Sequence, residues 1–429
     1  MTGTRPLADH LFRREAGRII ASLVRSFGVR NLELAEDAVQ DALVRALETW
    51  KFGGSPENPG AWLMRSARNR AVDLLRRQGR AGWLASAAIQ EVEAGADAAE
   101  VEADEHAIAD DELRLMFSCC DPALAPPAQV AVILKYLCGF SVQEVAQAFL
   151  STEAALEKQL FRSRHTLEAR GALFEVRDAA QVRQRLPSVQ GAIYLLFNEG
   201  YHGAHPRQAV REELCHEAMR LGALLARLPL AAGPETQALL ALFCFLAARL
   251  PARVGDDGNL LLLAEQDRGR WDRELVAEGL RRLDLSAEGE TLSAWHLEAA
   301  IAARHSTAAS FEQTDWESIL ELYDLLVAVR ETPVVALNRA IALGMARGPE
   351  EGLEALAAIR DRERLERYPF LHAAVAELEL RAGRPGPARR ALRVALSLAR
   401  NPAEEALLAR KLQACDRSPA GPRAGGWPP

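Results

Sequence analysis

The run from Pro59 to Arg77 most constrains the fold, because its apolar residues recur at three- and four-residue steps. This spacing predicts a helix with one buried face, formed by Ala61, Met64, Ala67, Ala71, Leu74 and Leu75. The rest of its surface is basic, and Trp62 lies within one turn of Arg65. A cationic helix beside an aromatic side chain suits a DNA backbone and an unstacked base. A solvated amphipathic helix explains this run alone equally well.

A second run, acidic in character, lies upstream over residues 33–50. Its apolar residues also follow a helical period, at Ala38, Val39, Ala42, Leu43 and Leu47. Taken together, the two runs and their spacing resemble region two of the extracytoplasmic function (ECF) sigma factors. That resemblance implies a helical domain over residues 1–80 that binds RNA polymerase core and promoter DNA.

The resemblance also implies roles for individual residues. In ECF factors the acidic helix binds the clamp helices of polymerase, and here the implied contacts are Glu36, Asp37, Gln40, Asp41 and Arg45. The later helix, with the loop before it, reads and melts the −10 promoter element. The implied DNA contacts are Trp62, Arg65, Arg68, Asn69, Arg76 and Arg77.

Composition favours packed helices. The chain has 429 residues, which suffices for about two to four domains. Apolar residues form 49% of it and aromatic residues only 6%, and the longer apolar runs carry a helical period, so we predict an all-α protein. The first residues lack the apolar core of a signal peptide, and no apolar run approaches membrane-spanning length, which predicts a cytoplasmic protein without membrane contact. The six cysteines form no CxxC pair, and we interpret them as small buried apolar residues rather than a redox or metal site.

The net charge of −7 argues at first against DNA binding, but its distribution answers that objection. Residues 1–80 carry an excess of about five positive charges, whereas residues 81–112 contain about ten acids and no Lys or Arg. We predict an acidic linker over residues 81–111. A passive tether fits this composition, and the family resemblance implies instead a linker that threads through the polymerase cleft.

A helix-turn-helix is predicted next, within a domain over residues 112–172. Ser141 and Glu144 form a capping-box pattern before a helix over 142–149, and Ser151 or Thr152 caps a basic helix over 153–169. This arrangement resembles region four of sigma factors, which reads the −35 element in the major groove. The implied DNA contacts are Ser151, Thr152, Glu153, Glu157, Lys158, Arg162 and Arg164, the two arginines touching phosphate. Many family members carry a small-Thr-Val-Lys-Ser-Arg run where this chain reads AALEKQ (154–159), so Glu157 either accepts from cytosine or pairs with a neighbouring arginine.

Residues 173–315 are predicted to form a helical extension. His202, His205 and His216 suggest a metal site, but no helix carries a histidine pair at i, i+4 with a neighbouring acid, so no metal or other cofactor is predicted. The cluster Glu265, Asp267, Arg268, Trp271 and Asp272 suits either a ligand pocket or, as we prefer, an ion-pair network between helices. We find no nucleophile and base pair and no phosphate loop, and therefore predict no enzyme.

Residues 316–417 are predicted to form tetratricopeptide-like helical repeats with a possible protein partner, followed by a disordered tail over 418–429. The whole layout resembles the ECF subgroup with a long tetratricopeptide-like extension. Its landmarks here are LLFNEGY (195–201), EQDRGRWD (265–272) and TDWESILELYDLL (314–326). This resemblance implies a sigma factor regulated in cis by its extension. The alternative is an operator-binding regulator whose helical repeats sense a ligand or a protein.

Overall fold

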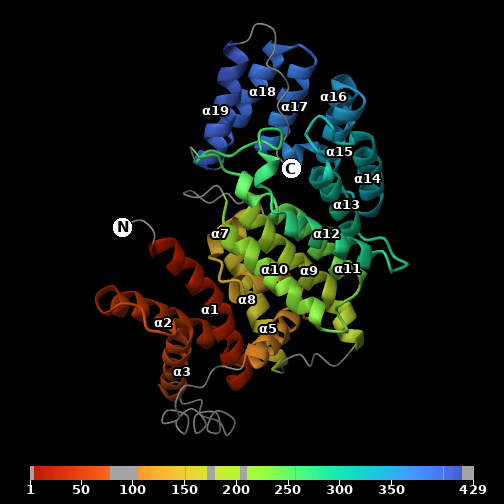
Figure 1. Ribbon diagram of the computed structural model, residues 1–429. Coiled ribbons are helices and arrows are strands. Elements are labelled where there is room, and N and C mark those ends of the chain that lie inside the picture. The colour runs from red at the N-terminus through yellow and green to blue at the C-terminus, as the bar shows by residue number, and fades with distance from the viewer. Residues whose placement is uncertain are drawn as a thin grey trace. The chain divides into compact units, whose positions relative to one another are not determined.

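The computed structural model describes residues 4–77, 105–149, 151–171, 179–202, 210–256, 258–399 and 401–417 (Figure 1). Over these ranges the regular structure is helical apart from one bridge between Val254 and Leu260, so the all-α prediction is confirmed. The chain divides into two compact units. Unit 1 comprises Met1–Leu196 with Arg227–Ala231, and unit 2 comprises Phe197–Ala226 with Ala232–Pro429. The division falls inside helix α9 (Ala179–His202), further along the chain than the boundary expected near residue 172.

The first three helices of unit 1 pack on one another: α1 (Thr4–Phe27), α2 (Leu32–Gly53) and α3 (Pro59–Arg77). Gly28 ends α1 with a φ of 84°, a conformation that glycine adopts without steric cost. Asn31 precedes α2, but its side chain donates from Nδ2 to the carbonyl oxygen of Phe27 at 2.6 Å and so closes the end of α1 instead. Asn58 caps α3, since its Oδ1 accepts from the Ala61 N–H at 3.0 Å.

The buried face of α3 differs in part from the predicted one. Ala67, Ala71 and Leu75 are buried as expected, whereas Met64 and Leu74 lie at the edge of the core. Leu63 and Val72 take the fully buried positions instead. The stripe is therefore rotated about the helix axis, because packing against α1 and α2 selects among apolar positions that the period alone ranks equally.

The second part of unit 1 contains α5 (Glu105–Cys119), α6 (Pro126–Tyr136), α7 (Val142–Ala148) and α8 (Glu153–Arg170). Helix α5 begins seven residues before the predicted end of the acidic linker; the rest of the linker lies outside the described residues, as does the tail over 418–429. The predicted capping box is present. The Glu144 carboxylate accepts from the Ser141 N–H at 2.8 Å, and the Ser141 hydroxyl accepts from the Glu144 N–H at 3.2 Å.

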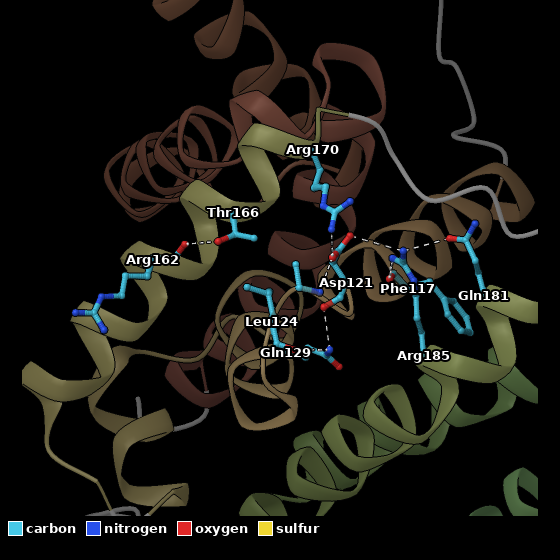
Figure 2. A network of polar contacts seen from close by, with 10 residues as sticks. Phe117, Asp121, Leu124, Gln129, Arg162, Thr166, Arg170, Gln181 and Arg185 are labelled. Carbon is cyan, nitrogen blue, oxygen red and sulfur yellow. Dashed lines mark hydrogen bonds and ion pairs between the residues drawn. The ribbon is translucent and has the colours of Figure 1, made fainter.

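Asp121 joins three parts of unit 1 in a buried polar network (Figure 2). Its carboxylate lies 3.6 Å from Arg170 at the end of α8 and 3.7 Å from Arg185 in α9. Arg185 also donates to the Phe117 carbonyl oxygen of α5 at 2.8 Å. Because one buried carboxylate is shared by two guanidinium groups, the network fixes the first half of α9 to the ends of α5 and α8.

Unit 2 begins with α10 (Glu212–Arg227), α11 (Pro234–Ala247), α12 (Arg273–Ser286) and α13 (Ala294–Thr307). Helix α11 is apolar on every side. The stretch Pro234–Ala252 is long and apolar enough to cross a membrane, contrary to the sequence expectation, but 78% of its most apolar window is buried within the protein. Such a helix is the core element of this unit, and Gly279 of α12 packs directly on its Phe245 ring.

The last helices of unit 2 are α14 (Trp316–Val329), α15 (Pro333–Ala346), α16 (Pro349–Ala357), α17 (Pro369–Arg381), α18 (Pro385–Ser397) and α19 (Pro402–Arg417) (Figure 1). The last five all begin at proline, whose missing N–H is not needed in the first turn. Neighbours in sequence pack on one another from α14 to α19. Helices α15 and α16 approach so closely that a Cβ on Gly352 would lie 2.7 Å from the Gly344 Cα.

Candidate nucleic-acid and protein interfaces

The outer face of α2 combines charge with exposed apolar surface. Four of the five residues predicted to contact polymerase are exposed there: Asp37, Gln40, Asp41 and Arg45. Val44 and Leu47 lie among them, with 54% and 57% of their surface exposed. Leu47, one of the apolar positions of the helical period, therefore lies outside the buried face, and Val44 was not among the positions singled out from the sequence. Exposed apolar residues within a charged rim mark a protein-docking surface.

Asp37 sits in the most negative part of this surface. Partial burial and the neighbouring carboxylates of Glu33, Glu36 and Asp41 raise its pKa above the usual value for aspartate. Clustered like charges repel one another, so a cationic partner that covers this face would relieve the repulsion.

Glu36, the fifth predicted contact, is engaged within unit 1. Its carboxylate lies 2.5 Å from Lys135 Nζ of α6, and less than a fifth of either side chain is exposed. The neighbouring Glu33 is 2.7 Å from Arg164 Nη1 of α8. These two ion pairs bridge the start of α2 to α6 and α8, an arrangement that no local sequence pattern indicates.

Helix α3 presents its basic face as the sequence predicts. Arg65, Asn69, Arg76 and Arg77 are exposed, and Arg68 is half-buried. Trp62 is also half-buried, because its ring packs edge-on against Trp50 of α2 with 5.5 Å between centroids. Arg70 pairs with Asp41 at 2.5 Å and so joins the basic face of α3 to the acidic face of α2.

Helix α8 exposes most of its predicted DNA contacts. Ser151, Thr152, Glu153, Glu157, Lys158 and Arg162 are exposed. Thr152 acts as the N-cap, its hydroxyl accepting from the Ala155 N–H at 3.3 Å, which leaves the first turn of α8 ordered for contact with a partner. Phe161, an apolar residue of the same helix, is 55% exposed.

Arg164 does not share that face. Its side chain is only 14% exposed and points to Glu33 and Glu168, and its guanidinium also lies near the buried hydroxyl of Tyr136. The structure therefore does not place Arg164 on the face that was predicted to contact phosphate. Three carboxylate and hydroxyl partners hold the group within unit 1, and helical spacing turns position 164 away from the exposed side of Arg162.

Helix α1 lies against the end of α6 at an unusually short distance. A Cβ added to Gly17 would lie 1.9 Å from the Leu137 carbonyl oxygen. Nearby, Arg25 of α1 pairs with the buried Asp111 of α5 at 3.0 Å. Helix α1, on which α2 and α3 pack, therefore also packs against α5 and the end of α6.

The EQDRGRWD segment of unit 2 is not the ion-pair network that we preferred from the sequence. Asp267 and Asp272 act as helix caps, accepting from the N–H groups of Gly269 and Glu274 at 2.8 and 2.9 Å. Arg268 donates to the backbone carbonyl oxygens of His305 and Ala308, at the end of α13, rather than to a carboxylate. Two residues of the segment form ion pairs, each with a residue outside it: Glu265 with Arg410 at 2.9 Å and Arg270 with Asp256 at 3.6 Å.

No group of three or more histidine, cysteine, aspartate or glutamate side chains is arranged to hold a metal ion within the described ranges. His202 contacts Arg253 through Nδ1 at 3.0 Å, His216 is exposed, and His205 lies outside the described residues. All six cysteines are free and buried, as predicted. Burial raises the pKa of the Cys119 thiol to about 12 and that of Cys244 to about 11, which keeps both protonated and unreactive.

Comparison with known proteins identifies the family. The chain is 39% identical over 405 residues to an uncharacterized protein of Rhizobium meliloti (strain 1021), and the alignment covers 94% of each protein. The chain belongs to that protein's family. Residues 11–81 match sigma-70 region 2, and residues 185–287 match a family of unknown function, DUF6596. No solved structure matches the chain.

The sigma-70 region 2 match covers α2 and α3 with both of their exposed faces. A domain of this kind indicates a role in transcription initiation, through binding to RNA polymerase core and interaction with the promoter. It acts by binding rather than by catalysis. The match to DUF6596, a family of unknown function, assigns no role to residues 185–287.

Proposed function

We propose that this chain is an ECF-type sigma factor that directs polymerase core to specific promoters from the cytoplasm. The observation that carries the proposal is the pairing, in one region 2 domain, of an exposed acidic and apolar face on α2 with an exposed basic face on α3. An operator-binding regulator needs only the basic face. The acidic face with Val44 and Leu47 requires a protein partner, and core polymerase is the partner of a region 2 domain.

The helix-turn-helix of α7 and α8 is the proposed reader of the −35 element. Lys158 and Arg162 are exposed on α8 and free to contact the DNA backbone, and Glu157 lies beside them in position to accept from a cytosine amino group. The ordered cap at Thr152 supports this role, because the recognition helix of such a motif presents its N-terminal residues to the major groove.

The extension is proposed to regulate the factor in cis. Successive packing from α14 to α19, with the glycine-mediated approach of α15 and α16, supports the tetratricopeptide-like interpretation of residues 316–417. Stacked helical pairs of this kind present a broad surface, which suits a protein partner.

The test is run-off transcription with purified polymerase core and the full-length chain. Asp37→Arg with Asp41→Arg reverses the charge of the α2 face, and we expect loss of core binding in a pull-down and loss of transcript. Glu405→Arg is the matched control, because it reverses an exposed acid on α19 and should leave both readouts unchanged. Core binding by the double variant as strong as that of the wild type would refute the proposal. Promoter binding that is specific without core would favour the operator-binding regulator.

A further inference from the structure

Unit 2 contains a cluster of buried polar side chains that the sigma factor role does not use. It is centred on Arg249, which follows α11 and has only 1% of its surface exposed. Tyr201 at the end of α9, Trp271 before α12 and His305 near the end of α13 are also buried. Arg268 in the short turn η3 (Arg268–Arg270) completes the cluster.

The positions of these groups are tied together by their contacts. The Arg249 guanidinium lies 5.4 Å from the centre of the Trp271 ring, and that of Arg268 lies 4.5 Å from the same ring. Arg249 also interacts electrostatically with Tyr201 and His305. Four side chains from three other parts of unit 2 therefore converge around the Arg249 guanidinium group.

Each of these five side chains carries a hydrogen-bonding atom with no partner among the described residues. The atoms are Nε and Nη2 of Arg249, the Tyr201 hydroxyl, Trp271 Nε1, Arg268 Nη2 and His305 Nδ1. Buried polar atoms are almost always paired, so several in one place require an explanation. Every one of these atoms except the His305 nitrogen can donate a hydrogen bond. A group that accepts several hydrogen bonds would therefore fit among them.

The positive charge of the cluster also favours a ligand that accepts hydrogen bonds. Arg253 and Arg268 both lie close enough to act on Arg249, and none of the three forms an ion pair within the described part of the chain. The exposed Glu312 carboxylate acts electrostatically on Arg268 but not on Arg249. Burial and these neighbouring cations lower the pKa of Arg249 to about 10, so the group still carries its charge at neutral pH. Burying a charge without a counterion is costly, and stacking on Trp271 offsets only part of that cost.

The two other arginines are already committed. Arg253 stacks on the Tyr201 ring at 4.0 Å and donates to the Tyr201 carbonyl oxygen at 3.2 Å. Arg268 donates to the carbonyl oxygens of His305 and Ala308 at 2.8 and 2.7 Å. Arg249 has no such bonds and is held in place by its surroundings, as the anchoring group of a binding site should be.

We propose that Arg249 anchors a buried binding site for the oxyanion group of a small molecule, with Tyr201 and Trp271 as further donors and Arg268 at its half-exposed edge. The chemistry is shared by carboxylate, sulfate and phosphate groups, each of which accepts several charge-assisted hydrogen bonds at once. Three of these residues and Arg249 itself lie within the DUF6596 segment, so the site gives that segment a ligand class. The proposal does not rest on the transcription role, since binding is measured without polymerase.

The test is isothermal titration calorimetry of the full-length protein with sodium sulfate, sodium phosphate and sodium acetate, each against sodium chloride at equal ionic strength. We expect one molar equivalent of at least one probe to bind, and the preferred probe separates a tetrahedral group from a carboxylate. Arg249→Met should weaken that binding at least about tenfold, because it removes a charged donor. Arg360→Met, at a side chain that is 81% exposed, is the matched control and should bind as the wild type does.

Tyr201→Phe is the second variant, because it removes one donor and keeps the ring against Arg253. We expect a smaller loss of affinity from it, and it decides the question if Arg249→Met does not fold. Absence of binding by all three probes, or equal affinity in wild type, Arg249→Met and Tyr201→Phe, would overturn the proposal.

Discussion

The close approach of Gly17 to Leu137 offers a way to separate the two parts of unit 1 that we propose bind DNA, without changing a charged residue. Contacts below 3.0 Å are not tolerated by a Cβ, and in Gly17→Ala the new atom would lie 1.9 Å from a backbone oxygen, so α1 and the end of α6 must move apart by more than 1 Å. Neither position carries a predicted contact to polymerase or DNA. The variant therefore perturbs the packing alone.

The size of the effect follows from two opposing terms. Overpacking at a tight contact costs about 1–3 kcal/mol, and alanine in place of glycine stabilises a helix by about 0.5–1 kcal/mol. A net cost of about 1–2 kcal/mol would shift the balance between packed and separated arrangements about 5- to 30-fold. Separation would also break the Lys135–Glu36 and Arg164–Glu33 pairs and expose the start of α2.

Two measurements detect the separation of α1 from the end of α6. A carbodiimide joins Lys135 to Glu36 when they are paired, and mass spectrometry should detect less of that cross-link in Gly17→Ala. Affinity for polymerase core should rise, because Glu36 becomes available to the partner of α2. Gly191→Ala in α9 is the control, since no heavy atom lies within 4 Å of its added Cβ. An unchanged cross-link would refute the steric reasoning, and a lost cross-link with unchanged core affinity would show that the packing does not limit polymerase binding.

Three other predictions follow from the same structure. Arg65→Ala with Arg68→Ala should weaken promoter binding by the holoenzyme on every sequence and flatten its salt dependence, and an unchanged salt slope would contradict a phosphate-contacting role. Thr152→Ala removes the cap of α8 and should lower the free energy of unfolding by about 1 kcal/mol in urea titrations, with Ser151→Ala as a control that changes little. Burial and the nearby arginines lower the pKa of His305 to about 3, so the folded state binds fewer protons than the unfolded state between that value and 6.5. The free energy of unfolding should therefore fall with decreasing pH in this window, by up to about 1.4 kcal/mol per pH unit from this residue. His305→Gln should show a shallower pH slope, and equal slopes would exclude a buried neutral histidine.

Elements with local signals were predictable from the sequence. The capping box at Ser141 and the cap at Thr152 act within three residues, so they determine where α7 and α8 begin whatever surrounds them. The apolar period likewise indicates that α3 is a helix. It does not determine which of Leu63, Met64 and Val72 is buried most deeply, because that depends on the helices packed against it.

Contacts between distant segments were not predictable. Nothing near Arg164 in sequence indicates that Glu33 lies 2.7 Å away, so a basic residue on a recognition helix was interpreted as a phosphate contact. Trp62 and Trp50 similarly meet only after the loop between them folds. The cluster around Arg249 combines residues from four separate parts of unit 2. The sequence singles out Arg268 and Trp271 for a possible ligand pocket, but no local pattern indicates that Arg249, Tyr201 and His305 join them.

Because all six thiols are buried, chemical labelling of these thiols reports on the unfolding of the chain. Cys119, Cys120 and Cys138 belong to unit 1, whereas Cys215, Cys244 and Cys415 belong to unit 2. A thiol-specific reagent reaches each sulfur only when the surrounding structure opens, so labelling followed by peptide mapping times that event separately in each half. Without any engineered probe, the order in which the promoter-binding half and the extension come apart can be read from three natural positions in each.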